Sequence, residues 1–242
     1  MTTPTDACGD LPTSGRGPVV AIDGPSGSGK STVARAVATD LGVGYLDTGA
    51  MYRALTWWCL HEGVDVNDRA AVAATMATLR LEVGTDPEEP WVRVGGHDVT
   101  QAIRETRISS VVSAVATNLD VRASMRLRQR AIIAESVERS GGCVAEGRDI
   151  TTVVAPDADV RVLLTASEDA RLARRTLEIH GGTDADSLAA TRDQIVRRDR
   201  DDSTVSQFVT AADGVVTVDT SALDLHEAIA AVLAVVREHA PA

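Results

Sequence analysis

The chain has 242 residues, of which 44% are hydrophobic and 24% charged, and its formal net charge is −11. This balance is typical of a globular protein, and the length suffices for one α/β domain with insertions. An acidic chain lacks the excess of cations that general binding to nucleic acid requires, so we expect no nucleic-acid partner. The sequence has no apolar run of membrane-spanning length and no basic-then-apolar leader. We therefore expect a cytoplasmic protein that binds no membrane.

The N-terminal part of the chain predicts a tail followed by alternating strands and helices. Residues 1–18 are rich in Thr, Pro and Gly and predict a disordered tail. Short apolar runs with β-branched residues indicate buried strands, and apolar residues on one face indicate helices. We expect strands over 19–23 and 45–46, and helices over 31–40 and 50–61.

The pattern changes between residues 63 and 104. Residues 79–83 and 91–94 alternate apolar with polar side chains, which is typical of half-buried antiparallel strands. Turn residues separate the two runs. We predict a small α+β insertion over 63–104, inside a domain that otherwise alternates strands with helices.

The C-terminal part of the chain resumes the alternating pattern. We expect a long helix over 121–139, strands over 143–145, 160–164 and 214–218, and a closing helix over 224–238. Five short apolar strands alternating with helices predict a parallel sheet covered on both faces. The predicted fold class is α/β, a P-loop NTPase-type three-layer sandwich with a five-stranded parallel sheet, the α+β insertion and a helical lid.

A glycine-rich segment stands between the first strand and the first helix. Gly24-Pro25-Ser26-Gly27-Ser28-Gly29-Lys30-Ser31 fits the pattern G-x-x-x-x-G-K-[ST] in the strand–loop–helix context that a P-loop requires. Glycines let backbone N–H groups surround a polyphosphate, and the N-terminus of the helix adds positive charge. Lys30 can reach the β- and γ-phosphates of ATP, and the Ser31 hydroxyl can ligate Mg²⁺. We expect the ATP site to extend from Gly24 through Thr32.

The P-loop alone does not separate a kinase from a motor, a GTPase or a transporter ATPase, but three further motifs accompany it. The motifs are Asp47-Thr48-Gly49-Ala50-Met51-Tyr52-Arg53, Gly147-Arg148-Asp149, and Arg198-Asp199-Arg200-Asp201-Asp202-Ser203-Thr204. Together these segments closely resemble the bacterial cytidylate (CMP) kinases of the nucleoside monophosphate kinase family, from about residue 19 to the C-terminal helix. The resemblance implies transfer of the γ-phosphate of ATP to CMP or dCMP, with an enlarged monophosphate-binding region at 63–104.

The resemblance also implies which residues bind the acceptor nucleotide. It assigns CMP contacts to Asp47, Thr48, Tyr52, Arg53, Ser113, Arg122, Arg148, Asp149 and Asp202, the last of these at the ribose. The chemistry of the residue types agrees, because arginine binds phosphate oxygens bidentately and carboxylates accept from the cytosine amine. Other interpretations stay open: Arg122 as one of several solvated arginines, and Thr48 and Ser113 as caps or core hydroxyls.

Residues 167–200 carry many arginines in an acidic chain, on two expected helices that break at Gly181-Gly182. We predict a mobile lid that brings positive charge to the transferring phosphoryl group. The candidate catalytic residues are Lys30, Arg148, Arg174 and Arg198. The core domain would then comprise 19–62, 105–166 and 201–242, and we expect a monomer.

Two residues depart from the family pattern. Val205 stands where many members have an arginine, and Thr151 stands where a glycine often follows the Gly-Arg-Asp-Ile sequence. Either a lid arginine replaces the missing contact at Val205, or CMP binds more weakly. Two other functions remain in view: a P-loop kinase for a different acceptor, and a regulatory module that binds ATP without transferring phosphate.

Overall fold

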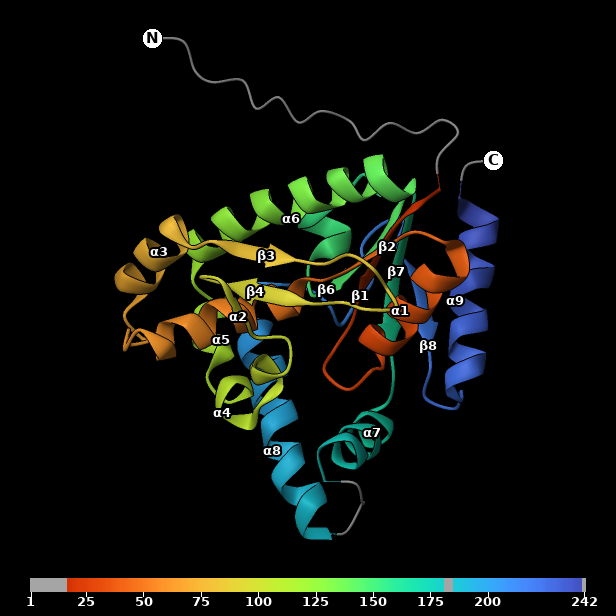
Figure 1. Cartoon of the computed structure of the whole chain (residues 1–242). Coiled ribbons are helices and arrows are strands. Elements are labelled where there is room, and N and C mark those ends of the chain that lie inside the picture. Colours follow the sequence, from red (N-terminus) through yellow and green to blue (C-terminus); the bar gives the residue numbers. More distant parts are fainter. Residues whose placement is uncertain (1–16, 181–184, 241–242) are drawn as a thin grey trace.

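The computed structural model describes residues 17–180 and 185–240 of the chain (Figure 1). Most of the predicted tail and the predicted break at Gly181-Gly182 lie outside the described residues. Within the described part of the chain, no helix is both long and apolar enough to span a membrane.

A five-stranded parallel sheet forms the centre of the molecule, and the predicted fold class is confirmed. Its strand order is β2-β6-β1-β7-β8. The strands are β1 (Val19–Asp23), β2 (Gly44–Asp47), β6 (Cys143–Gly147), β7 (Val160–Thr165) and β8 (Val216–Asp219). The last strand begins two residues later than the sequence predicted, because Gly214 adopts a left-handed φ of 72° in the turn before it.

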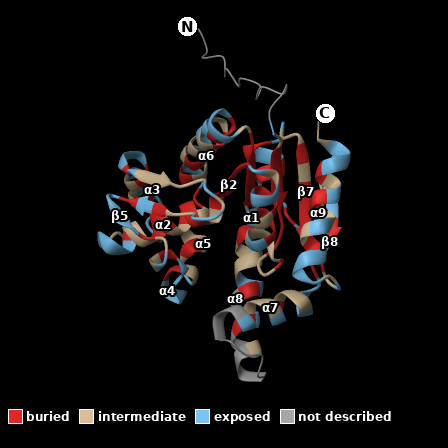
Figure 2. Cartoon of the chain, turned by 45° about the vertical axis from the view of Figure 1, so that its right-hand side comes forward, coloured by how far each residue is buried: buried red, intermediate tan, exposed pale blue. Residues whose placement is uncertain are grey.

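Helices cover both faces of the sheet, which makes three layers. Successive residues of a strand point to opposite faces, so Val19 and Ala21 join one buried cluster while Val20 and Ile22 join the other. The first cluster packs under α2 (Thr48–His61) and α6 (Leu119–Ser140), and the second under α1 (Lys30–Leu41) and α9 (Leu225–His239). Figure 2 shows these central strands as buried and the outer helix faces as exposed.

The segment 63–104 forms a small antiparallel sheet in the order β3-β4-β5, next to α3 (Arg69–Thr78). Its strands are β3 (Leu81–Val83), β4 (Val92–Val94) and β5 (His97–Asp98). We did not predict β5, because its two residues are polar and exposed and carry no apolar alternation. Gly95 and Gly96, which both have positive φ, form the turn before it. Val92 and Val94 belong to the same buried cluster as Leu55 of α2, so the small sheet packs on that helix.

The remaining elements surround one edge of the parallel sheet. They are η1 (Ala102–Arg104), α4 (Thr106–Ser109), α5 (Val112–Ala116), the π-helix η2 (Ile150–Val154), α7 (Glu168–His180) and α8 (Ala185–Asp202). Helices α7 and α8 form a pair at the bottom of Figure 1. The neighbouring strands β2, β6 and β1 end at Asp47, Gly147 and Asp23, so the three sequence motifs that follow them meet at this edge.

Candidate active site

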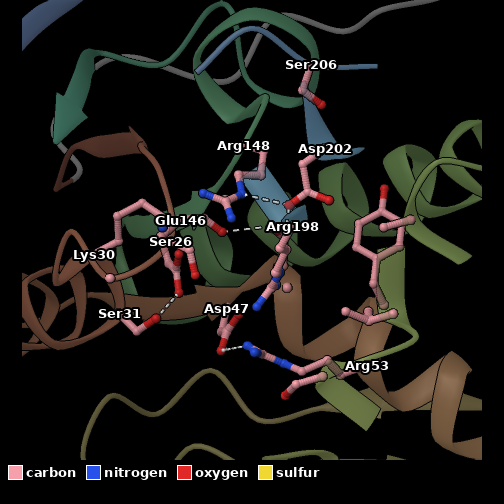
Figure 3. Close-up of a pocket in the computed structure, with 18 of the residues that line it drawn as sticks. Ser26, Lys30, Ser31, Asp47, Arg53, Glu146, Arg148, Arg198, Asp202 and Ser206 are labelled. Atoms are coloured by element: carbon pink, nitrogen blue, oxygen red, sulfur yellow. Dashed lines mark hydrogen bonds and ion pairs between the residues drawn. The ribbon is translucent and has the colours of Figure 1, made fainter. Parts of the chain in front are cut away.

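A cavity of about 260 Å³ opens at the carboxyl edge of the sheet, between the P-loop, α2, α5, α6 and α8 (Figure 3). Among the described residues, seven cationic side chains and four carboxylates line it. The cations are Lys30, Arg53, Arg104, Arg122, Arg148, Arg175 and Arg198, and the carboxylates are Asp47, Glu146, Asp149 and Asp202. An acidic chain thus concentrates positive charge at one concave site, which suits an anionic ligand.

The P-loop backbone depends on its glycines at two positions. Gly27 and Gly29 have left-handed φ values of 76° and 88°. A Cβ atom on Gly27 would also lie 2.7 Å from the carbonyl oxygen of Arg171. Of the predicted ATP-binding residues, six line the cavity and three do not. Those lining it are Ser26, Gly27, Gly29, Lys30, Ser31 and Thr32, and the other three are Gly24, Pro25 and Ser28.

Lys30 begins α1 and projects into the cavity. Its Nζ donates to the carbonyl oxygen of Pro25 at 3.0 Å. Burial, and secondly the positive charge of Arg148, lower the pKa of Lys30 to about 8. An anion bound beside Lys30 would therefore relieve an unfavourable buried charge.

Glu146 is a site residue that the sequence reasoning missed. Glu146 lies near the C-terminal end of β6, lines the cavity and is only 3% exposed. Its carboxylate accepts a hydrogen bond from the Ser31 hydroxyl at 2.6 Å. Burial, and secondly the charge of Asp47, raise the pKa of the Glu146 carboxyl. One feature of the sequence could have pointed to Glu146: it is an acidic residue near the end of an apolar strand, next to the strand that precedes the P-loop. A hydroxyl and a carboxylate oxygen side by side are the hard oxygen donors that suit Mg²⁺.

The motif over residues 47–53, at the end of β2, faces the cavity and is also held by local hydrogen bonds. Asp47 caps α2 by accepting from the Ala50 N–H at 2.8 Å, and its other oxygen lies 3.4 Å from Nη2 of Arg53. The Thr48 hydroxyl donates to the carbonyl oxygen of Glu146 at 2.8 Å. Thr48 thus makes a core hydrogen bond and also lines the cavity, so its contact with CMP stays a prediction.

Arg122 is not one of the solvated arginines of α6, so that alternative is wrong. Its Nη2 lies 2.5 Å from Oδ2 of Asp149 and 2.9 Å from the Ser206 hydroxyl, and its Nη1 donates to the carbonyl oxygen of Ala116. Only 15% of the side chain is exposed. Burial raises the pKa of Asp149, although the charge of Arg122 opposes the shift. Tyr52 lines the cavity with this pair.

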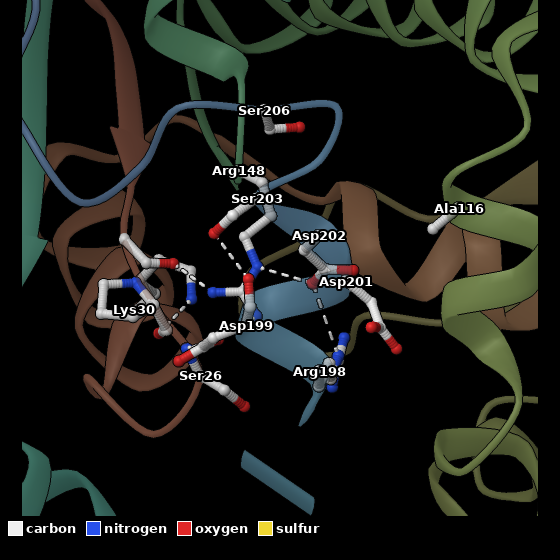
Figure 4. Close-up of polar contacts among 12 residues, drawn as sticks. Ser26, Lys30, Ala116, Arg148, Arg198, Asp199, Asp201, Asp202, Ser203 and Ser206 are labelled. Carbon is white, nitrogen blue, oxygen red and sulfur yellow. Dashed lines mark hydrogen bonds and ion pairs between the residues drawn. The ribbon is translucent and has the colours of Figure 1, made fainter. Parts of the chain in front are cut away.

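Arg148 connects the P-loop to α8 (Figure 4). Its Nη1 donates to the carbonyl oxygen of Gly24 at 2.6 Å, its Nη2 to Asp199 at 3.0 Å, and its Nε to Asp202 at 3.1 Å. Asp202, which the resemblance places at the ribose, is thus an arginine partner in this structure while also lining the cavity. Asp199 additionally accepts from the Ser26 N–H at 3.0 Å, and the sequence reasoning did not single it out.

The lid arginines take different positions. Arg198 and Arg175 line the cavity, whereas Arg174 does not. Burial, and secondly the charge of Arg148, lower the pKa of Arg198 to about 10. Arg174 instead donates to the carbonyl oxygens of Thr220 at 2.6 Å and Leu223 at 3.2 Å, so it fastens α7 to the core.

Ser113 also does not line the cavity, although α5 contributes to it. The residues of this region that line it are Ser109 of α4 and Val112 and Ala116 of α5. Arg104 of η1 lines the cavity and was not predicted. No motif surrounds it in the sequence, so only the folded chain brings it to the site.

Comparison with known proteins identifies the family. The sequence model of the family described as cytidylate kinase matches residues 20–238. The chain belongs to the cytidylate kinase family. It is 46% identical to the cytidylate kinase of Streptomyces griseus over 219 residues, covering 90% of this chain and 92% of that protein. It is 48% identical to the cytidylate kinase of Cutibacterium acnes over 217 residues, covering 89% and 94%. A bifunctional pantoate ligase/cytidylate kinase of Synechococcus is 49% identical over 193 residues, which cover 78% of this chain and 38% of that protein.

As a member of the cytidylate kinase family, the chain is a phosphotransferase. The structure shows what surrounds Thr151 and Val205, the two residues that depart from the family pattern. The Thr151 hydroxyl donates to Oδ2 of the buried Asp23 at 2.7 Å, and the backbone N–H groups of Ile150 and Thr151 also donate to that carboxylate. These hydrogen bonds anchor the segment after Arg148-Asp149 to the end of β1. Val205 does not line the cavity, but the next residue, Ser206, does.

Replacement of Arg174 by leucine tests its position in this cytidylate kinase family member. We expect Arg174→Leu to lower the free energy of unfolding by about 1–3 kcal/mol, because the carbonyl oxygens lose a charged donor. The kcat should fall less than about tenfold, since the side chain lies outside the cavity. Thermal melts and steady-state kinetics check this, with the exposed Arg197→Leu as control. A loss of kcat as large as that of Arg198→Leu would return Arg174 to the catalytic group.

Proposed function

We propose that this chain transfers the γ-phosphoryl group of ATP to CMP or dCMP, giving ADP and CDP or dCDP. The observation that carries the proposal is one continuous cavity with two chemically different ends. The P-loop and Lys30 line the part that we assign to the donor, and Tyr52, Arg122 and Asp149 line the part that we assign to the acceptor. Membership in the cytidylate kinase family supports ATP as the donor and a cytidine nucleotide as the acceptor.

The donor end suits a triphosphate with Mg²⁺. Ser26, Gly27 and Gly29 of the P-loop line the cavity next to the N-terminus of α1, and Lys30 adds a cation. We assign the ion to the Ser31 and Glu146 oxygens, which already lie 2.6 Å apart. When bound, Mg²⁺ supplies charge neutralisation at the β- and γ-phosphate oxygens.

The acceptor end suits a nucleoside monophosphate. The Nε atoms of Arg53 and Arg198 are buried and have no hydrogen-bond partner within the described part of the chain, although the Nε of Arg198 lies 3.8 Å from Oδ2 of Asp202. Buried donors without a hydrogen bond are costly, so a bound phosphate group that accepts from both would be favoured. The Asp149 carboxylate can accept from the cytosine amine, and Arg122 can donate to the ring, which favours cytosine over uracil.

The proposed chemistry needs no general base. The attacking oxygen of the CMP phosphate is already anionic, so we assign no residue to proton removal. The oxygen attacks the γ-phosphorus of ATP in line, a P–O bond forms, and the bond to the β-phosphate oxygen breaks with ADP as leaving group. Lys30, Arg148 and Arg198 hold the reacting groups in place and neutralise the charge that spreads over the γ-phosphoryl oxygens.

We further propose that residues 167–200 act as the lid, residues 63–104 as the monophosphate-binding insertion, and the chain as a monomer. Arg175 and Arg198 support the lid assignment, because both reach the cavity from α7 and α8. A lid that closes over the nucleotides would exclude water from the transfer and prevent hydrolysis of ATP.

A coupled assay with CMP, dCMP, UMP and AMP as acceptors tests the proposed function. We expect kcat/KM to be highest for CMP or dCMP, because UMP cannot donate an amine to Asp149. Preference for UMP or AMP would overturn the cytidylate assignment in favour of another P-loop kinase. ATP binding by calorimetry with no CDP formed on long incubation would instead favour the regulatory module.

A further inference from the structure

Phe208 lies against the flat face of the Arg148 guanidinium group. Its ring centroid is 4.4 Å from Cζ of Arg148, and the residue is 1% exposed. It is the one phenylalanine of the sequence. A guanidinium group over an aromatic ring is held by electrostatic attraction and stacking, and the attraction is strongest where water is excluded.

The edges of the same guanidinium group are largely occupied. A guanidinium has five N–H donors, all in one plane. One N–H of each Arg148 nitrogen is used, by Asp202 at Nε, by Gly24 at Nη1 and by Asp199 at Nη2 (Figure 4). Two N–H groups therefore remain without a partner among the residues that the structure describes, and the plane of the guanidinium group decides where they point.

The contacts at the edges do not all belong to the same part of the molecule. Asp199 and Asp202 both lie on α8, so they would shift relative to Arg148 if α8 moves. Gly24 follows β1, and Phe208 lies beyond the end of α8, in a segment that leads to β8. The ring of Phe208 and the Gly24 carbonyl thus hold Arg148 from outside the lid helix.

We propose that Phe208 is a positioning residue for phosphoryl transfer, which fixes the plane of the Arg148 guanidinium so that its two unused N–H groups meet the transferring phosphoryl oxygens. The inference rests on the proposed function, in which Arg148 acts on those oxygens. Phe208 itself touches no substrate and acts through Arg148 alone.

Kinetics of three variants test the proposal. Phe208→Met keeps a large apolar side chain but removes the aromatic face, and we expect about a tenfold fall in kcat with little change in KM for CMP. Phe208→Tyr keeps the ring and should retain most of the wild-type kcat. Val209→Ala shortens an exposed apolar side chain next to Phe208, outside the cavity lining, and should leave kcat unchanged. A kcat within twofold of wild type in Phe208→Met overturns the proposal.

A second readout does not depend on activity. The Nε–H resonance of Arg148 in a ¹⁵N spectrum, assigned by its loss in Arg148→Lys, should carry the ring-current shift of Phe208. We expect it to move in Phe208→Met and to stay in Val209→Ala, and an unmoved resonance in Phe208→Met overturns the inference. If the wild-type chain fails to phosphorylate CMP while this resonance moves as expected, the proposed function fails and the contact between ring and guanidinium stands.

Discussion

Replacement of Lys30 by alanine is expected to lower kcat by about 10³-fold, because the γ-phosphoryl group loses its nearest mobile cation. The fold should remain intact. Burial disfavours the charged amine, as its pKa of about 8 indicates, so its removal does not destabilise the native state. Steady-state kinetics and a thermal melt measure both effects. Arg35→Ala, which removes an exposed cation from the same helix, is the matched control. Undiminished turnover in Lys30→Ala would remove Lys30 from the mechanism.

The same residue predicts a pH dependence of ATP affinity. In the free protein Lys30 is charged below about pH 8 and loses its charge as the pH rises through that value. ATP affinity should therefore weaken between pH 7 and pH 9.5 in the wild-type chain. It should weaken less in Lys30→Arg, because a guanidinium stays charged throughout this range. Titration calorimetry at the two pH values decides between these outcomes.

Replacement of Arg148 by lysine is expected to lower kcat by about 10²- to 10³-fold, even though the positive charge is kept. A lysine has one nitrogen and cannot reach the Gly24 carbonyl, Asp199 and Asp202 in the separate directions that the guanidinium serves. The largely buried carboxylates of Asp199 and Asp202 would then lose the guanidinium group that both contact. We also expect a lower melting temperature, because Asp199 and Asp202 lose a shared and largely buried partner, although Asp199 keeps its pairing with Arg171 and Asp202 its pairing with Arg198.

Arg200→Lys is the control for this second prediction. Arg200 lies on α8 as well, but its side chain is 76% exposed and its pairing with Asp201 is at the surface. An exposed pair contributes little, so both kcat and melting temperature should match those of the wild type. Wild-type kinetics in Arg148→Lys would contradict the role assigned to the guanidinium.

The predicted elements were correct where local chemistry decides them. The sequence predicts the strand over 19–23, because a short apolar run indicates a buried strand. It also predicts the glycine turn at 27 and 29 and the helix over 31–40, which the structure shows as Lys30–Leu41. Strand burial, backbone freedom and helix starts are local properties. Boundaries were less accurate. The helix predicted over 121–139 extends as α6 from Leu119 to Ser140, because the Asn118 side chain caps its first turn and Gly141 ends it.

The site residues divide in the same manner. Motif residues such as Lys30, Arg53 and Arg148 line the cavity, as the sequence indicated. Arg174 and Arg198 are both arginines of predicted helices, and no local feature separates them. Only the packing of α7 on Thr220 and Leu223 turns Arg174 away from the cavity while Arg198 faces it.

The sequence by itself therefore determined the P-loop, the parallel sheet and the membership of the acceptor motifs in one kinase pattern. The tertiary structure decided which charges meet. Glu146 reaches Ser31 across 115 positions of the chain, and Arg148 reaches the Gly24 carbonyl across 124. Phe208 likewise meets Arg148 across a long stretch of chain. Such contacts depend on the order of the strands and the packing of the lid helices, and the spacing of the motifs predicts neither.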